Sequence, residues 1–254
     1  MKITKLASKP VEKSVSINSS QPTEMEQHSP PIIGISGKEG SGKDTCGALL
    51  KKRFPDYQLA SFALKVKQVV AIFTDTTLEF QLSREGKNTT VPPLNDEDPL
   101  NWVGKISRVL AMLPKYRTKR DKKWLEVFYE SLRALTIGSL ISYGRLQQIV
   151  GTEFKTPFGK DLWVQILFEH RPPHSGLIIT DVRFKVEAEC ILNHGGILLR
   201  MEGDPANVRA TSTRDPQHIS EVELDNYPNF TQIIDNSEVG VELLDKKLDR
   251  VFNH

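Results

Sequence analysis

The stretch GISGKEGSGKDT, residues 34–45, decides the fold. It contains the pattern G-x-x-x-x-G-K from Gly37 to Lys43, between an apolar run at 32–36 that predicts a buried strand and a pattern at 43–54 that predicts a helix. Glycines at such a junction let backbone N–H groups turn inward around phosphate oxygens, and the helix N-terminus favours an anion. We therefore expect a phosphate-binding loop formed by Gly37, Lys38, Gly40, Ser41, Gly42, Lys43, Asp44 and Thr45.

The residue after the loop lysine departs from the strict pattern, which has Ser or Thr there. Asp44 takes that position and Thr45 follows it. The hydroxyl that ordinarily meets Mg²⁺ is therefore displaced, or Asp44 holds the metal through water, and we assign Asp44 and Thr45 to the metal. Loops ending in GK-x-T are tolerated in small-molecule and nucleotide kinases, and no guanine-reading NKxD is present. The loop favours a kinase over a switch or motor protein.

Composition excludes several other classes. The 254 residues are 38% hydrophobic and 26% charged, which is enough to bury a core, and the net charge of +2 indicates neither a dedicated nucleic-acid-binding nor a membrane-surface protein. No apolar run approaches the roughly 20 residues of a membrane span. Cys46 and Cys190 lie far apart and form neither a disulfide framework nor a CxxC zinc pattern, which favours a reduced cytosolic compartment.

Residues 1–30 differ in composition from the rest of the chain. They are polar, rich in Ser, Lys and Pro, and without hydrophobic periodicity. They lack the apolar segment of a secretory signal, and their glutamates argue against an organelle transit peptide. We expect a disordered leader at 1–30 and one folded domain at 31–254.

Within 31–254, apolar strands alternate with helical patterns, which predicts an α/β fold of three layers around a parallel sheet. Residues 75–176 break this alternation and are largely helical, so we expect an insert at the carboxyl edge of the sheet that forms a lid and an acceptor pocket. His170 and His174 have metal-like spacing, but two prolines separate them and no partner ligands are near in sequence, so we reject a zinc site. Strands are predicted at 32–36, 57–62, 177–180, 197–201 and 232–234, and helices at 43–54, 64–73, 102–113, 123–135, 144–150, 161–170, 185–193 and 241–252.

An acidic residue follows the apolar run 177–180. Asp181 takes the position from which an acid can hold Mg²⁺ through water or orient an attacking phosphate. The alternative is that Asp181 caps the helix that follows. Arg183 favours the first interpretation, since its planar fork suits bidentate phosphate contact.

Four blocks of sequence together resemble the phage-type deoxynucleoside monophosphate kinases. They are GKEGSGKDT (37–45), RLQQIVGTEF with DLWV (145–154 and 161–164), TDVRFKVEAECILNHGGILLR (180–200), and HISEVELD with IIDN (218–225 and 233–236). The resemblance implies a P-loop kinase fold, ATP·Mg²⁺ as donor and a deoxynucleoside monophosphate (dNMP) as acceptor. Residues 75–124 have no counterpart, and Lys-Val at 185–186 replaces a common Pro-Asn.

The resemblance also assigns residues. Lys43, Asp44 and Thr45 match the donor and metal site, and Lys43, Asp181 and Arg183 are the expected catalytic residues. Residues expected to bind the dNMP are Lys65, Arg145, Gly151, Thr152, Trp163, Asp181, Arg183 and Glu187.

Each assignment has a structural alternative. Trp163 is also compatible with a core position, Arg145 with a surface helix, and Gly151-Thr152 with a helix end. The segment His218, Ser220, Glu221 resembles a helix cap, and we assign no chemistry to it. The basic run 115–123 is interpreted as a solvated face, with a phosphate-closing lid as the alternative.

These observations predict a cytoplasmic enzyme that moves the γ-phosphoryl group of ATP to a dNMP, with no nucleic-acid or membrane partner and with a homodimer left open. The alternatives are another small P-loop kinase, acting on dephospho-coenzyme A or a nucleoside, and a non-catalytic ATP-binding regulator. A regulator needs no second set of phosphate-binding cations, so the pair Asp181 and Arg183 argues against it.

Overall fold

The computed structural model describes residues 31–94, 99–113, 118–169 and 175–252. The expected leader at 1–30 lies outside these residues, as do both histidines of the rejected zinc site and part of the basic run 115–123.

Within the described residues, the chain forms a five-stranded parallel sheet in the order β2-β3-β1-β4-β5. The strands are β1 (Ile32–Gly37), β2 (Gln58–Ala60), β3 (Leu177–Val182), β4 (Ile197–Glu202) and β5 (Gln232–Asp235). The central strands are apolar along most of their length because helices cover both faces. The predicted α/β fold with a parallel sheet is confirmed, and it is consistent with a P-loop kinase fold.

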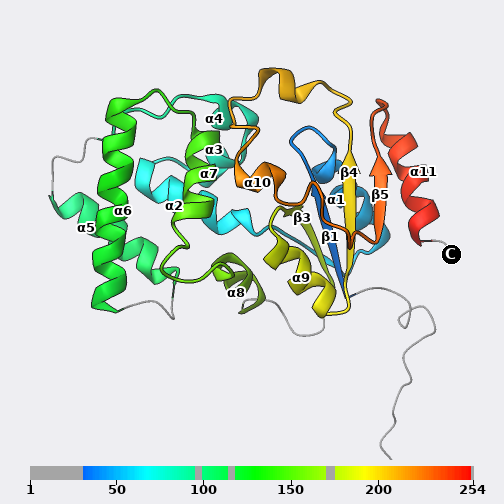
Figure 1. The fold of residues 1–254 in the computed structure, drawn as a ribbon, viewed down its shortest axis with the longest axis horizontal. Helices are drawn as coiled ribbons and strands as arrows, with labels where there is room; N and C mark the ends of the chain where they lie inside the picture. The colour runs from blue at the N-terminus through cyan, green and yellow to red at the C-terminus, as the bar shows by residue number, and fades with distance from the viewer. Residues whose placement is uncertain (1–30, 95–98, 114–117, 170–174, 253–254) are drawn as a thin grey trace, which may run out of the picture.

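Two separate hydrophobic clusters define the layers. On one face, α1 (Lys43–Arg53) and α11 (Val241–Phe252) pack against the sheet (Figure 1), through residues such as Leu50 and Leu248 against Ile33 and Leu199. On the other face, α9 (Lys185–Asn193) contributes Ile191 to a larger cluster. The sheet is therefore the middle of three layers.

The predicted insert is helical, and it gathers at one side of the sheet (Figure 1). It shares the larger hydrophobic cluster with β1, β3 and α9, so it is packed continuously with the sheet. The helix α2 (Ala63–Thr74) leads into the insert, whose helices are α3 (Leu78–Leu82), α4 (Arg84–Asn88), α5 (Pro99–Ala111), α6 (Lys119–Gly138), α7 (Tyr143–Glu153) and α8 (Leu162–Glu169). None of the helices in the described ranges is long and apolar enough to cross a membrane.

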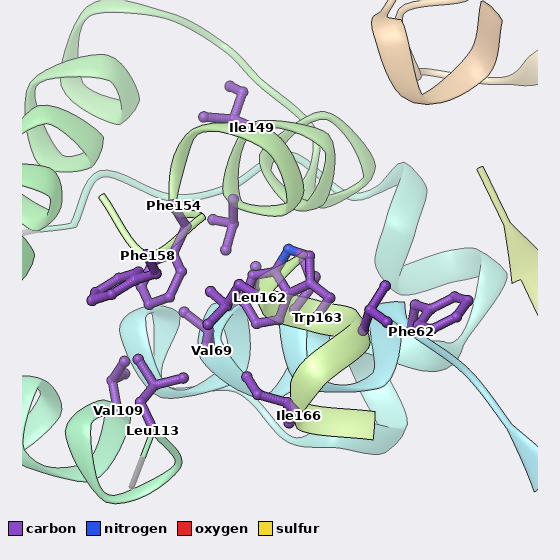
Figure 2. Packing of buried hydrophobic residues seen from close by; sticks show 14 of the residues in the cluster. Phe62, Val69, Val109, Leu113, Ile149, Phe154, Phe158, Leu162, Trp163 and Ile166 are labelled. Atoms are coloured by element: carbon purple, nitrogen blue, oxygen red, sulfur yellow. The ribbon is translucent and has the colours of Figure 1, made fainter. Parts of the chain in front are cut away.

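Trp163 lies inside this cluster (Figure 2). Its ring stacks on Phe154 with centroids 5.5 Å apart. Its indole Nε1 points toward α7 and donates to the carbonyl of Gly151 at 2.9 Å. Trp163 therefore holds α8 against the end of α7 as a core residue.

The sequence missed short elements and misplaced some ends. The helices α3 and α4, η1 (Val208–Thr211) and α10 (Ile219–Val222) have five residues or fewer, too few for a period of 3.6 to be recognisable. β2 covers only part of the predicted 57–62. β3 continues past the predicted end at residue 180 and includes Asp181.

Gly196 shows how closely α9 approaches β1. A Cβ atom there would lie 2.7 Å from the carbonyl oxygen of Ile32 and 2.9 Å from that of Ile191. We expect Gly196→Ala to lower the free energy of unfolding by about 1–3 kcal/mol, because backbone atoms must move. Gly104→Ala on α5, where a Cβ atom meets nothing within 4 Å, is expected to raise it by about 0.5–1 kcal/mol. Urea unfolding measures both; a change of the same sign in the two variants contradicts this packing.

Candidate active site at the carboxyl ends of the strands

The predicted phosphate loop joins β1 to α1. Its backbone has positive φ angles at Gly37, Gly40 and Gly42. At Gly42, φ is 89° and a Cβ atom would lie 2.4 Å from the side-chain nitrogen of Asn236, which itself donates to the Ser41 carbonyl at 3.1 Å. Only glycine fits this turn.

Lys43 is the first residue of α1, and its side chain is buried. Its Nζ donates to the carbonyl oxygen of Lys38 at 2.5 Å. Burial, assisted by the charge of Arg183, lowers the pKa of Lys43 from 10.5 to about 7. A ligand phosphate beside Nζ would favour the charged form and raise this pKa again.

Two cavities meet at the loop. The acceptor-side cavity, as we name it, lies among the loop, α2, α7, α8 and the end of β3; the donor-side cavity lies between the loop and the segments that follow β4 and β5. Lys43 and Asp44 line both cavities, whereas Thr45 lines the donor-side cavity. The walls that the two cavities share are formed by Glu39, Gly40, Lys43, Asp44 and Lys87.

The acceptor-side cavity is lined by both charged and apolar side chains. Its cationic lining residues are Lys43, Lys67, Lys87, Arg183 and Arg214, and its acidic ones are Glu39, Asp44, Asp181 and Glu187. Its apolar and amide-bearing lining residues include Phe62, Val66, Trp163, Gln147 and Gln148. Such a cavity suits an anionic group joined to a flat, apolar one.

Glu221 holds two of these cations together. Its Oε2 lies 2.7 Å from Nη1 of Arg183, and its Oε1 lies 2.6 Å from Nη2 of Arg214. Arg183 also donates to the carbonyl of Ser220 at 3.1 Å. The two arginines lower the pKa of Glu221 although burial opposes this.

The expected helix cap is present too, since His218 Nδ1 accepts from the backbone N–H of Ser220 at 3.3 Å. The cap segment thus has a further role, as the anchor of both guanidinium groups.

Asp181 makes a helix cap, but for a different helix from the one considered above. Its carboxylate accepts from Ser61 Oγ at 2.7 Å and from the backbone N–H groups of Phe62 and Ala63 at 2.9 and 2.8 Å. It therefore caps α2. The helix that follows Asp181, α9, is capped instead by Glu187, whose Oε2 accepts from the N–H groups of Arg183 and Phe184.

Two residues expected at the acceptor are not among those that line the acceptor-side cavity. Lys65 lies on α2, whose lining residues there are Ala63, Val66 and Lys67. Arg145 pairs with Asp215 at 3.3 Å. Of the other expected dNMP contacts, Gly151, Thr152, Trp163, Asp181, Arg183 and Glu187 do line the cavity. In the loop, Lys38 is engaged by Asp225 at 2.8 Å.

Sequence reasoning missed Lys67, Lys87, Arg214 and Glu221. For Lys67 a signal was present, since Ala63, Val66 and Lys67 follow the i, i+3, i+4 spacing of one helix face and Lys65 does not. For Arg214 and Glu221 no local pattern exists. They pair within the stretch between β4 and β5, which also contacts the loop where Arg209 Nε donates to the carbonyl of Glu39.

The residues of the loop are compatible with ATP and Mg²⁺. The buried Ser41 Oγ has no hydrogen-bond partner among the described residues. Asp44 and Thr45 offer the oxygen ligands that Mg²⁺ prefers. Among the described residues, the loop included, no group of three or more His, Cys, Asp or Glu side chains could hold a metal.

Comparison with known proteins gives one related sequence. No model of a protein family matches the chain. The chain is 26% identical over 223 residues to a protein of Acanthamoeba polyphaga mimivirus named "Putative deoxynucleotide monophosphate kinase", and the match covers 87% of this chain and 96% of that protein. The resemblance to deoxynucleoside monophosphate kinases is supported. At this degree of identity the likeness supports a kinase, and it does not identify the substrate.

Glu187 gives the site a measurable pH dependence. Burial, and then the charge of Asp181, raises its pKa from 4.5 to about 8. The folded protein therefore binds one proton more than the unfolded chain between these values. The resulting stability is complete below about 4.5 and is lost as the pH rises to about 8.

We expect Glu187→Gln, which imitates the protonated acid, to remove this dependence. The difference in unfolding free energy between the variant and the unmodified protein should grow with pH by up to about 1.4 kcal/mol per pH unit in that range. Urea unfolding at a series of pH values measures it, with Glu189→Gln on the exposed side of α9 as control. A difference that does not change with pH would mean that Glu187 is ionised throughout.

Proposed function

We propose that the protein is a deoxynucleoside monophosphate kinase, formed by residues 31–254 as one domain and acting in the cytoplasm. A 5′-phosphate oxygen of the dNMP attacks the γ-phosphorus of ATP, the bond from that phosphorus to the β–γ bridging oxygen breaks, and dNDP and ADP result. The observation that carries the proposal is that Lys43 and Asp44 line both cavities, with a cluster of buried and partly buried cations on the acceptor side.

On the donor side, the loop from Gly37 to Thr45 would hold the ATP phosphates through its backbone N–H groups. Asp44 and Thr45 would hold Mg²⁺, which neutralises charge on the β and γ oxygens. Lys43 would lie where the two phosphate groups meet. Transfer then requires little beyond in-line positioning, neutralisation of charge and exclusion of water.

On the acceptor side, Arg183 and Arg214 would neutralise the 5′-phosphate, with Lys67 beside them. Arg183 and Arg214 are already oriented by Glu221, so little reorganisation is needed when the phosphate enters. Lys65 and Arg145, the other cations expected from the resemblance, do not line this cavity. The acceptor phosphate is already an anion, so the reaction requires no general base.

The alternatives fit the cavity less well. A nucleoside brings no phosphate, so it would make no use of the cations that line the acceptor side. A regulator that only senses ATP has no use for a second cavity. The deciding experiment incubates the protein with ATP·Mg²⁺ and each of the natural dNMPs, NMPs, nucleosides and dephospho-coenzyme A, and follows ADP release. Release with dNMPs supports the proposal; release only with another class of acceptor overturns it.

Replacement of the loop lysine tests the donor side. Lys43→Met is expected to lower phosphoryl transfer by about 10²–10⁴-fold while the fold remains, because it removes a charge at the transferring group. In the unmodified protein, ATP binding at about pH 8 should take up a proton, since a phosphate raises a pKa that starts at about 7.

Calorimetry in two buffers of different ionisation enthalpy measures this uptake, which should vanish in Lys43→Met. Lys52→Met, on the exposed side of the same helix, serves as control. Transfer within a few-fold of the unmodified rate would exclude Lys43 from the site.

A pair of arginine variants tests the acceptor side. Arg183→Lys is expected to lower kcat/KM for the dNMP by about 2–4 kcal/mol in transition-state terms, because a lysine cannot both pair with Glu221 and hold a phosphate with two parallel hydrogen bonds. Arg145→Lys should change it little, since Arg145 pairs with Asp215 outside the cavity lining. ATP affinity should be unchanged in both. Equal losses in the two variants, or a loss of ATP affinity alone, would show that the cavity is assigned wrongly.

A further inference from the structure

The wall of the acceptor-side cavity contains an amide that is held in one orientation. Gln147 on α7 is buried, and its Nε2 donates to both the side-chain Oε1 and the backbone carbonyl oxygen of Gln81, at 2.8 and 2.9 Å. A backbone carbonyl can only accept a hydrogen bond. The nitrogen of the Gln147 amide must therefore point to Gln81, and its oxygen must point away.

A chain of hydrogen bonds fixes the orientation of Gln81 in the same way. The chain begins at the carbonyl of Val70, which accepts from the hydroxyl of Thr74 at 2.8 Å. Thr74 has then used its proton, so in the 3.0 Å contact between the two hydroxyls Thr76 is the donor. Gln81 Nε2 in turn donates to Thr76 Oγ1 at 2.8 Å, which leaves Gln81 Oε1 to accept from Gln147.

The chain ends at the cavity with an unused acceptor. Among the described residues, Gln147 Oε1 has no hydrogen-bond partner, and it is not enclosed by protein. The same cavity is lined by the apolar side chains of Phe62, Val66 and Trp163. The neighbouring Gln148 differs, because its Oε1 accepts from the backbone N–H of Asp215 at 3.1 Å.

We propose that Gln147 reads the base of the acceptor nucleotide, with Oε1 accepting a hydrogen bond from an N–H group of that base. The inference rests on the proposed function and extends it to the substrate. The site selects monophosphates whose base presents a ring N–H or an exocyclic amine to this oxygen, and it rejects bases that present only acceptors or a methyl group there. Gln81 is a positioning residue, since it prevents the Gln147 amide from turning its nitrogen toward the cavity.

The test changes both sides of the hydrogen bond. Steady-state kinetics compare dTMP with its N3-methyl analogue, and dAMP with the monophosphate of purine 2′-deoxyriboside, which lacks the amine. In at least one pair, the unmodified protein should have a KM about tenfold higher for the analogue that lacks the N–H than for the natural acceptor, with little change in kcat. In Gln147→Leu, the KM of the natural acceptor of that pair should rise by a similar factor. The analogue that lacks the N–H should then have the same KM as the natural acceptor.

Two more variants complete the design. Gln81→Met should reduce the discrimination within the pair by freeing the Gln147 amide to rotate, a result that a purely structural role would not produce. Gln232→Leu on the exposed β5 is the control and should discriminate like the unmodified protein. If Gln147→Leu still discriminates as well as the unmodified protein, or if the unmodified protein discriminates in neither pair, Gln147 does not read the base. Failure of the proposed function is distinct, because then the unmodified protein turns over no dNMP at all.

Discussion

The carboxylate of Asp181 joins the end of β3 to the start of α2, and the acceptor-side cavity depends on that junction. Two backbone N–H groups and one hydroxyl converge on its oxygens. The first turn of α2 is thereby held at the carboxyl end of the sheet, with Phe62 and Val66 on the cavity wall. A carboxylate at a helix N-terminus is favoured both by these hydrogen bonds and by the helix dipole. The strand end therefore positions the insert as well as contributing a residue to the proposed site.

Charge in the cavity is kept low by burial. The pKa of Lys43 falls to about 7 and that of Arg214 to about 10, while the pKa of Glu187 rises to about 8. Burial is the largest cause in each case, because a low-dielectric surrounding disfavours the charged form. Glu221 keeps its charge, and with it those of the two arginines it contacts. Entry of a phosphate group would raise the pKa of Lys43 again, so the lysine would gain its charge when the anion binds.

Features that local sequence patterns indicate could be predicted, whereas contacts between distant segments could not. The parallel sheet and the long helices were predicted correctly, because the alternation of apolar strands with helical patterns is visible among neighbours in the chain. The pairing of Glu221 with Arg183 depends on residues 38 positions apart, and nothing in the local pattern indicates it. The resemblance assigns Lys65 to the dNMP, but Lys65 is not among the α2 residues that line the cavity. Had the spacing from the start of α2 been followed, Lys67 would have been the residue expected at the cavity.

The two cavities are built differently, and the difference affects how each could discriminate between nucleotides. Part of the wall of the acceptor-side cavity comes from α2, α7 and α8, which share one hydrophobic cluster with the sheet. Displacing Trp163 or Val66 disturbs that cluster, so in the proposed complex the core would determine the position of the base. The donor-side cavity is closed by segments after β4 and β5, which hold the loop through polar contacts such as Arg209 Nε to the Glu39 carbonyl at 2.8 Å. Exposed polar contacts can be exchanged at small cost in free energy, whereas core packing cannot. The proposed selectivity for the base therefore rests on the acceptor side, where hydrogen bonds to Gln81 fix the amide of Gln147.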